Sequence, residues 1–146
     1  MPADLAAVSG LATLHPMLAL VALHFAVTIR MYFARLGEMK RERIHPQQLG
    51  TRAEVVERLR DSRASDHYAN LSELPVLFYP AVMLVWLLGL TDPLYLALAW
   101  AFVAARAVHA GIQLTFNRVL WRFFAFISGA ALLAALWLRL AADVLT

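Results

Sequence analysis

The chain of 146 residues contains no cysteine and few charged side chains. Without cysteine it has no disulfide framework, no thiolate nucleophile and no cysteine metal site. Only 16% of the residues are charged and 62% are hydrophobic, whereas soluble domains have about 25% charged and about 45–50% apolar residues. The mean hydropathy is +0.65. This composition excludes a disordered chain and argues against a soluble domain, so it indicates a membrane protein.

The chain also lacks basic residues ahead of its first apolar stretch, since residues 1–4 read Met-Pro-Ala-Asp. A cleaved signal peptide would begin with such residues, so we expect the first apolar stretch to remain as a membrane span. The length fits one domain, and four spans of about 20 residues fit within it. We therefore predict a single all-α domain over residues 1–146, an integral membrane four-helix bundle with up-down-up-down topology.

Apolar stretches separated by polar breaks predict the four spans. They cover about residues 5–33, 66–90, 93–116 and 120–144. A capping box at Thr51–Glu54 predicts that the second helix begins before it enters the membrane. Asp92 suits a helix N-cap, and Pro93 suits the first helical position. The segment from Asn117 to Arg122 is the polar cluster at which the long C-terminal stretch, which has no proline, can turn.

The basic residues predict the topology because they gather on one side of the spans. Eight of the 13 lysines and arginines lie between Arg35 and Arg63, in a loop expected over about residues 34–62. Arg118 and Arg122 lie on the same side of an up-down-up-down bundle. By the positive-inside rule this side is cytoplasmic, and both termini lie on the opposite side. Because the basic residues flank apolar spans, we expect membrane lipid as the partner and no nucleic acid.

Polar side chains at membrane depth are costly and therefore mark candidate functional sites. Two helix faces carry such side chains, with Asp66, Asn70 and Glu73 in the second helix and Arg106, His109, Gln113 and Asn117 in the third. Helical spacing places each set within one arc of its helix. Glu73 and Arg106 lie at matching depths from the cytoplasmic ends, so we predict that they form a buried ion pair.

Two interpretations of these polar rows stay open. Interhelical polar contacts can simply hold a bundle together. The surplus of donors, together with Arg118 and Arg122, instead predicts a basic pocket that suits a polar anionic ligand. Pro75 and Pro80 either bend the second helix beside this pocket or are merely tolerated there. The small residues at 128–131 predict close packing of the fourth helix.

The histidines allow a third interpretation. His24 and His109 lie at similar depths and could ligate a b-type haem in the bundle core. The simpler expectation is that His24 is a hydrogen-bonded core residue and that His109 contacts a ligand. His15, beside Pro16, reads as a local or interfacial residue. No other metal site is expected.

These residues resemble the MAPEG family, the membrane-associated proteins in eicosanoid and glutathione metabolism, and in particular a bacterial-type branch of it. The second-helix motif is Arg63-Ala64 followed by Asn70-x-x-Glu73-x-Pro75. The third-helix run is Trp100-x-Phe102-Val103-x-x-Arg106-x-x-His109, followed by Asn117-Arg118 and Arg122. The resemblance covers about residues 60–130, and the first span is similar in topology only.

The resemblance implies a homotrimer in a bacterial inner membrane that binds glutathione between subunits near the cytoplasmic side. It implies a transferase or peroxidase that acts on a hydrophobic electrophile from the bilayer. Arg122 matches the catalytic arginine that stabilises the glutathione thiolate, which would lower the pKa of the thiol. The implied glutathione-binding residues are Asn70, Glu73, Arg106, His109, Gln113 and Arg118.

Two positions depart from the glutathione-using members of that family. Asp66 stands where those members often have an arginine, and its carboxylate would repel a carboxylate of glutathione. Gln113 stands where they have a tyrosine that contacts glutathione. These departures keep open a non-catalytic protein of the same fold that binds a lipid or a partner, with a haem carrier as a minor alternative.

Overall fold

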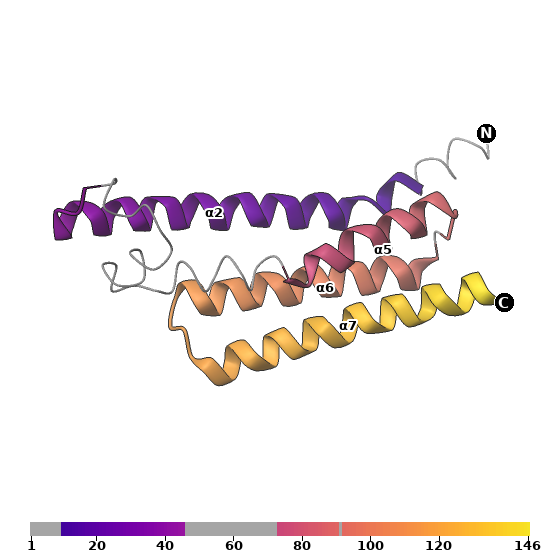
Figure 1. Cartoon of the computed structure of the whole chain (residues 1–146). Helices are drawn as coiled ribbons and strands as arrows, with labels where there is room; N and C mark the ends of the chain where they lie inside the picture. The colour runs from indigo at the N-terminus through magenta and orange to yellow at the C-terminus, as the bar shows by residue number, and fades with distance from the viewer. Residues whose placement is uncertain (1–9, 46–72, 91) are drawn as a thin grey trace.

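The computed structural model describes residues 10–45, 73–90 and 92–146. Within these ranges the regular structure is helical and consists of α2 (His15–Glu42), α5 (Pro75–Leu87), α6 (Pro93–Leu114) and α7 (Val119–Leu145). Figure 1 shows the helices lying side by side, each running opposite to the one before it. The predicted all-α four-helix bundle is confirmed.

The helices form a closed ring in which α2 and α7 each contact both α5 and α6. In the centre of this ring, Phe78 of α5 stacks on Phe102 of α6 with the ring centroids 4.5 Å apart. Both side chains are fully buried, and Leu20 of α2 and Leu136 of α7 belong to the same apolar cluster. All four helices therefore share one core.

The turn from α5 to α6 follows the signals in the sequence. Gly89 adopts a φ of +69°, which glycine reaches without a steric cost. The Asp92 side chain accepts a hydrogen bond from the backbone N–H of Leu94 at 2.6 Å. Pro93 occupies the first turn of α6, where its missing N–H is not needed. The predicted cap and helix start are confirmed.

The turn from α6 to α7 also lies where it was predicted, with α6 ending at Leu114 and α7 beginning at Val119. Asn117 adopts a φ of +44°, a left-handed conformation that asparagine tolerates better than most residues. Its backbone N–H donates to the carbonyl oxygen of Ile112 at 2.8 Å. This hydrogen bond closes the C-terminal end of α6.

The helix α2 extends beyond the apolar segment that predicted it. It continues nine residues past Phe33 and ends at Glu42, so the part of the expected 34–62 loop up to residue 42 is helical. Lys40 and Arg41 lie in its last turn, where positive charge interacts favourably with the helix dipole. Figure 1 shows this end of α2 reaching past the turn between α6 and α7.

The two prolines of α5 have different effects. Pro75 occupies the first turn of α5, where its missing N–H costs no hydrogen bond of that helix. Pro80 lies inside the helix, where it weakens the hydrogen bonds of the preceding turn. The indole N–H of Trp137, on α7, donates to the Leu77 carbonyl in that turn at 3.1 Å.

The capping box predicted at Thr51–Glu54 lies outside the described residues.

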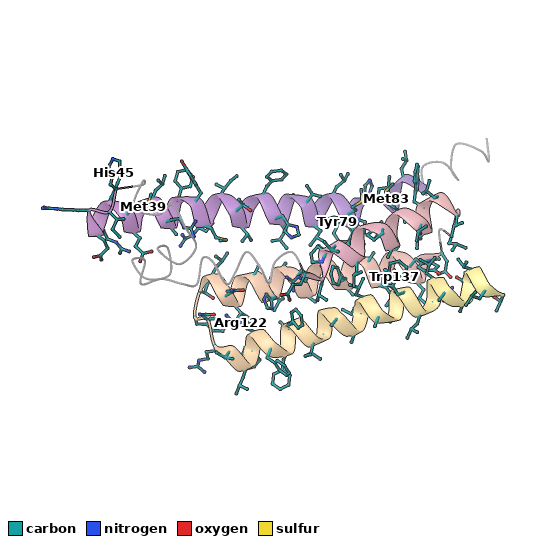
Figure 2. The ribbon with its side chains drawn as sticks, viewed as in Figure 1. Met39, His45, Tyr79, Met83, Arg122 and Trp137 are labelled. Carbon is teal, nitrogen blue, oxygen red and sulfur yellow. The ribbon has the colours of Figure 1, made fainter. Side chains whose placement is uncertain are left out.

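The outer surface of the bundle is strongly apolar. In the part of the chain that the structure describes, three helical segments are long and apolar enough to cross a membrane, namely Gly10–Glu42, α6 and α7. Large side chains such as Phe25 on α2 and Phe124 on α7 are more than half exposed. Figure 2 shows side chains projecting outward along the whole of α2. Such faces match the hydrocarbon of a bilayer.

Candidate functional site

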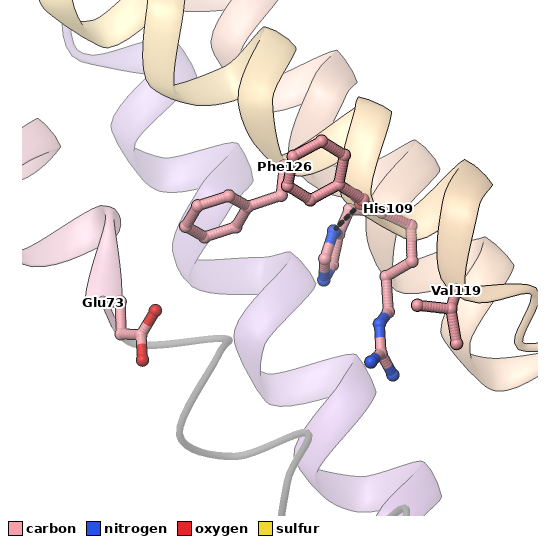
Figure 3. A pocket seen from close by; sticks show the side chains of 6 residues that line it. Glu73, His109, Val119 and Phe126 are labelled. Atoms are coloured by element: carbon pink, nitrogen blue, oxygen red, sulfur yellow. Dashed lines mark hydrogen bonds between the residues drawn. The ribbon is translucent and has the colours of Figure 1, made fainter.

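A cavity of about 330 Å³ lies between the residues that precede α5, the second half of α6 and the first two turns of α7. Its polar lining consists of Glu73, His109 and Arg122. The apolar lining consists of Val119, Phe123 and Phe126. In Figure 3 the Glu73 carboxylate lies on one side of the cavity, and His109 and Val119 lie on the other. A cavity of this size can hold a small molecule.

The Arg122 side chain is held from the turn that precedes α7. Its Nη1 donates to the Oδ1 of Asn117 at 3.1 Å. The backbone carbonyl of Arg122 accepts a hydrogen bond from Nδ1 of His109 at 3.2 Å. With the proton on Nδ1, a neutral His109 has an acceptor at Nε2. His109 therefore links α6 to the first turn of α7.

Arg106 is fully buried on the same face of α6, with an exposed fraction of 0%. A Cβ added to Gly129 of α7 would lie 3.8 Å from the Arg106 Cδ, so α6 and α7 approach closely at this glycine. The predicted close packing around residues 128–131 is therefore confirmed at Gly129. The Arg106 side chain thus packs toward α7.

The predicted buried pair of Glu73 and Arg106 is not formed. Glu73 is exposed in the single chain, and its carboxylate faces the cavity. It still contributes a favourable Coulomb interaction to Arg106. The prediction used only the depth of the two residues along their helices, and depth does not determine in which direction a side chain points. Arg106 faces α7, whereas Glu73 lies just before α5.

Gln113 is 4% exposed, and neither the nitrogen nor the oxygen of its amide has a hydrogen-bond partner among the described residues. A buried polar group left without a hydrogen bond costs about 1–3 kcal/mol. Native proteins rarely leave such groups unsatisfied. Gln113 is therefore a side chain that a ligand, a water molecule or a second chain can satisfy.

The structure thus brings only part of the predicted site together. Glu73, His109 and Arg122 meet at the cavity, while Arg106 and Gln113 lie buried on the α6 face that carries His109. Arg118 caps α7, is exposed, and does not line the cavity. Two further candidates, Asn70 and Asp66, lie outside the described residues.

His24 is hydrogen-bonded, as predicted. Its Nδ1 lies 2.9 Å from the carbonyl oxygen of Leu20 and 3.2 Å from the hydroxyl of Tyr79 on α5. Figure 2 shows Tyr79 on the α5 ribbon next to α2. His24 therefore bonds toward α5, whereas His109 bonds toward α7. His15 is exposed at the start of α2.

A second polar cluster, which was not predicted from the sequence, lies at the other end of α6. The Tyr95 hydroxyl donates to Oδ2 of Asp143 at 2.7 Å. Arg139 pairs with Asp92, and its Nε lies 3.8 Å from Asp143. The Arg139 guanidinium also lies over the Tyr95 ring, 5.0 Å from its centroid. The spacing of Arg139 and Asp143, four residues apart on one helix, is the signal that could have revealed it.

A model of the MAPEG family matches residues 13–142. The chain belongs to the MAPEG family. The match covers the whole cavity lining and all or most of each apolar candidate span. This MAPEG protein is therefore an integral membrane protein. No curated protein and no solved structure matched the chain.

Proposed function

We propose that this MAPEG protein binds glutathione in the cavity at the start of α7 and transfers it to a hydrophobic electrophile from the bilayer, or uses it to reduce one. The observation that carries this proposal is the composition of the cavity. Glu73, His109 and Arg122 offer charge and hydrogen bonds, while Phe123 and Phe126 offer an apolar wall. A polar thiol and an apolar acceptor can therefore lie next to each other.

The functional groups of glutathione fit these residues. Its ammonium group suits the exposed carboxylate of Glu73, and its carboxylates or its thiolate suit the Arg122 guanidinium. The amide of Gln113, one turn from His109 on α6 and outside the cavity lining, offers a further donor and acceptor near this site. These complementary groups support glutathione, rather than a purely apolar lipid, as the ligand.

When bound, glutathione supplies a thiol: its proton passes to solvent, its sulfur bonds to the electrophilic carbon, and that carbon releases its leaving group, which is the halide in a nitroaryl halide. The Arg122 guanidinium would stabilise negative charge on that sulfur and favour the nucleophilic form. The aromatic wall of Phe123 and Phe126 would exclude water and so strengthen this electrostatic effect. Arg122 is accordingly the proposed catalytic residue.

The proposal extends to assembly and orientation. Glu73 is exposed in the single chain, so a neighbouring copy in a homotrimer could cover it and complete the site. The basic residues near the end of α2, together with Arg118 and Arg122, favour a cytoplasmic location for this end of the bundle under the positive-inside rule. A bacterial inner membrane is the location that we infer.

The direct test uses detergent-purified protein and reduced glutathione. We expect glutathione to raise the unfolding temperature and the protein to conjugate glutathione to a nitroaryl halide. The Arg122→Ala variant should conjugate far more slowly, while Arg41→Ala, which removes an exposed arginine from α2, should keep the wild-type rate. A wild-type protein that neither binds glutathione nor forms the conjugate would contradict the proposal.

The same preparation separates the alternatives. A non-catalytic lipid-binding protein would retain a lipid whose binding is unchanged by Arg122→Ala. A haem carrier would show a Soret absorption band that His24→Ala or His109→Ala removes. We expect a colourless protein in which Arg122→Ala weakens ligand binding.

A further inference from the structure

We propose that Asn117 is a positioning residue that holds the Arg122 guanidinium toward the cavity. This inference rests on the proposed role of Arg122. It concerns a residue outside the cavity lining, in the turn between α6 and α7. Its hydrogen bond from Arg122, at 3.1 Å, joins the two residues across that turn.

An arginine side chain needs such an anchor because it is long and flexible. Holding a free arginine in one rotamer costs up to about 2 kcal/mol of entropy. The Arg122 backbone is already held, since its N–H donates to the Arg118 carbonyl at 3.1 Å and its carbonyl accepts from His109. Asn117 supplies the acceptor for the other end of the residue.

The anchor leaves most of the guanidinium available. Arginine has five N–H donors, and Asn117 accepts from one nitrogen, Nη1. Within the described ranges, no other acceptor bonds the Arg122 guanidinium. Asn117 also carries no charge, so it fixes the guanidinium without neutralising it. A ligand thiolate would therefore meet a fixed positive charge whose other N–H donors are not bonded within the described ranges.

Asparagine satisfies two separate requirements at this position. The left-handed φ of +44° favours glycine, asparagine or aspartate. The hydrogen bond to Arg122 requires a short side chain that carries an acceptor. Glycine would meet only the first requirement, so Asn117→Gly separates the role in the turn from the role in positioning. Asn117→Asp would keep the acceptor but add a negative charge.

The first measurement does not depend on catalysis. Restricted rotation of the Arg122 guanidinium is detected by NMR in protein labelled with ¹⁵N-arginine, and Arg122→Lys assigns the signal. We expect the wild type and Asn117→Asp to show a restricted guanidinium, and Asn117→Gly to show a freely rotating one. Equal rotation in the wild type and in Asn117→Gly would overturn the inference, whether or not the protein uses glutathione.

The second measurement is the pH profile of glutathione conjugation. We expect Asn117→Gly to lower kcat about tenfold, a change of about 1.4 kcal/mol, with a smaller change in KM and a higher apparent pKa of the bound thiol. Asn117→Asp should also raise that pKa, because its charge opposes the thiolate. A purely structural role predicts that Asn117→Gly keeps the wild-type profile, and that result would overturn the inference.

Thr115→Val is the matched control in the same turn. The Thr115 hydroxyl donates to the carbonyl of Gly111 at 2.7 Å and does not contact Arg122. We expect this variant to change the unfolding temperature without changing the thiol pKa or the Arg122 NMR signal. If Thr115→Val reproduced the effects of Asn117→Gly, general loosening of the turn would explain them and the positioning role would be rejected.

Discussion

The two polar clusters of this bundle contain similar residues but use them differently. Around Asp92, the guanidinium of Arg139 pairs with Asp92, approaches Asp143 and covers the Tyr95 ring. Around Arg122, the one acceptor that bonds the guanidinium among the described residues is a neutral amide, and the nearby carboxylate of Glu73 stays exposed beside a cavity. The charge of Arg139 is balanced by carboxylates of the same chain, whereas the Arg122 guanidinium bonds no carboxylate among the described residues.

This difference distinguishes a charged residue that stabilises the bundle from one that is available to a ligand. Charged groups in membrane segments generally pair with one another or mark a site. The cluster around Arg139 follows the first pattern, and its hydrogen bonds join the start of α6 to the end of α7. The cluster around Arg122 follows the second pattern. Variants in each cluster can therefore test this contrast.

The largest effect on stability is expected at Arg106, which lies between the two clusters. Arg106→Met should lower the free energy of unfolding by about 3 kcal/mol, since methionine cannot replace the packing of this fully buried side chain against α7. Unfolding in mixed detergent micelles measures this change. Arg30→Met, at an exposed position on α2, is the control. A stable Arg106→Met protein that lost only ligand binding would place Arg106 in the functional cluster instead.

The next largest effect is expected at Arg122. Arg122→Ala should slow glutathione conjugation about 100-fold, the rate equivalent of about 2.7 kcal/mol, because a preorganised positive charge is lost. Its unfolding temperature should stay close to that of the wild type, since the side chain is only half-buried. Conjugation kinetics and thermal unfolding on the same preparation measure both quantities. A large loss of stability with an unchanged rate would reverse the assignment.

Arg139→Ala should give the opposite result. We expect a loss of about 1 kcal/mol in unfolding free energy, since its ion pairs and its contact with the Tyr95 ring are partly exposed. The conjugation rate should not change. Measured beside Arg122→Ala, this variant completes the comparison. A slower conjugation rate at unchanged stability would show that the cluster around Asp92 is also functional.

The smallest effect is expected from Tyr79→Phe. This variant removes the hydrogen bond between Tyr79 and His24 and should cost about 0.6 kcal/mol, as single interhelical hydrogen bonds do in membranes. Its unfolding free energy supplies the baseline against which the Arg139 cluster is judged. A cost as large as that of Arg139→Ala would mean that the cluster is no stronger than one ordinary contact.

The sequence predicted the features that depend on local chemistry. Asp92 and Pro93 started α6, and Asn117 marked the turn into α7, because caps and left-handed residues have strong local preferences. The limit of α2 was less predictable, since hydropathy indicates where a span leaves the membrane and not where its helix ends. α2 therefore continues to Glu42.

The candidate site was predictable in its members but not in its pairing. Helical spacing placed Arg106, His109 and Gln113 on one buried face, as expected. The direction in which the Glu73 side chain points depends on how α5 begins at Pro75. Residue spacing along α6 carries no information about the start of α5. The contacts of Asn117 with Arg122, and of Tyr95 with Asp143, join different segments, so they required the packed structure.

The most direct test of the contrast is amide hydrogen exchange with and without reduced glutathione. We predict slower exchange in residues 109–126, which form the cavity and the turn before α7, and no change in residues 139–146. Arg122→Ala should abolish this protection, and Arg139→Ala should preserve it. Protection confined to residues 139–146, or no protection in either region, would contradict the assignment of the functional site to the cavity around Arg122.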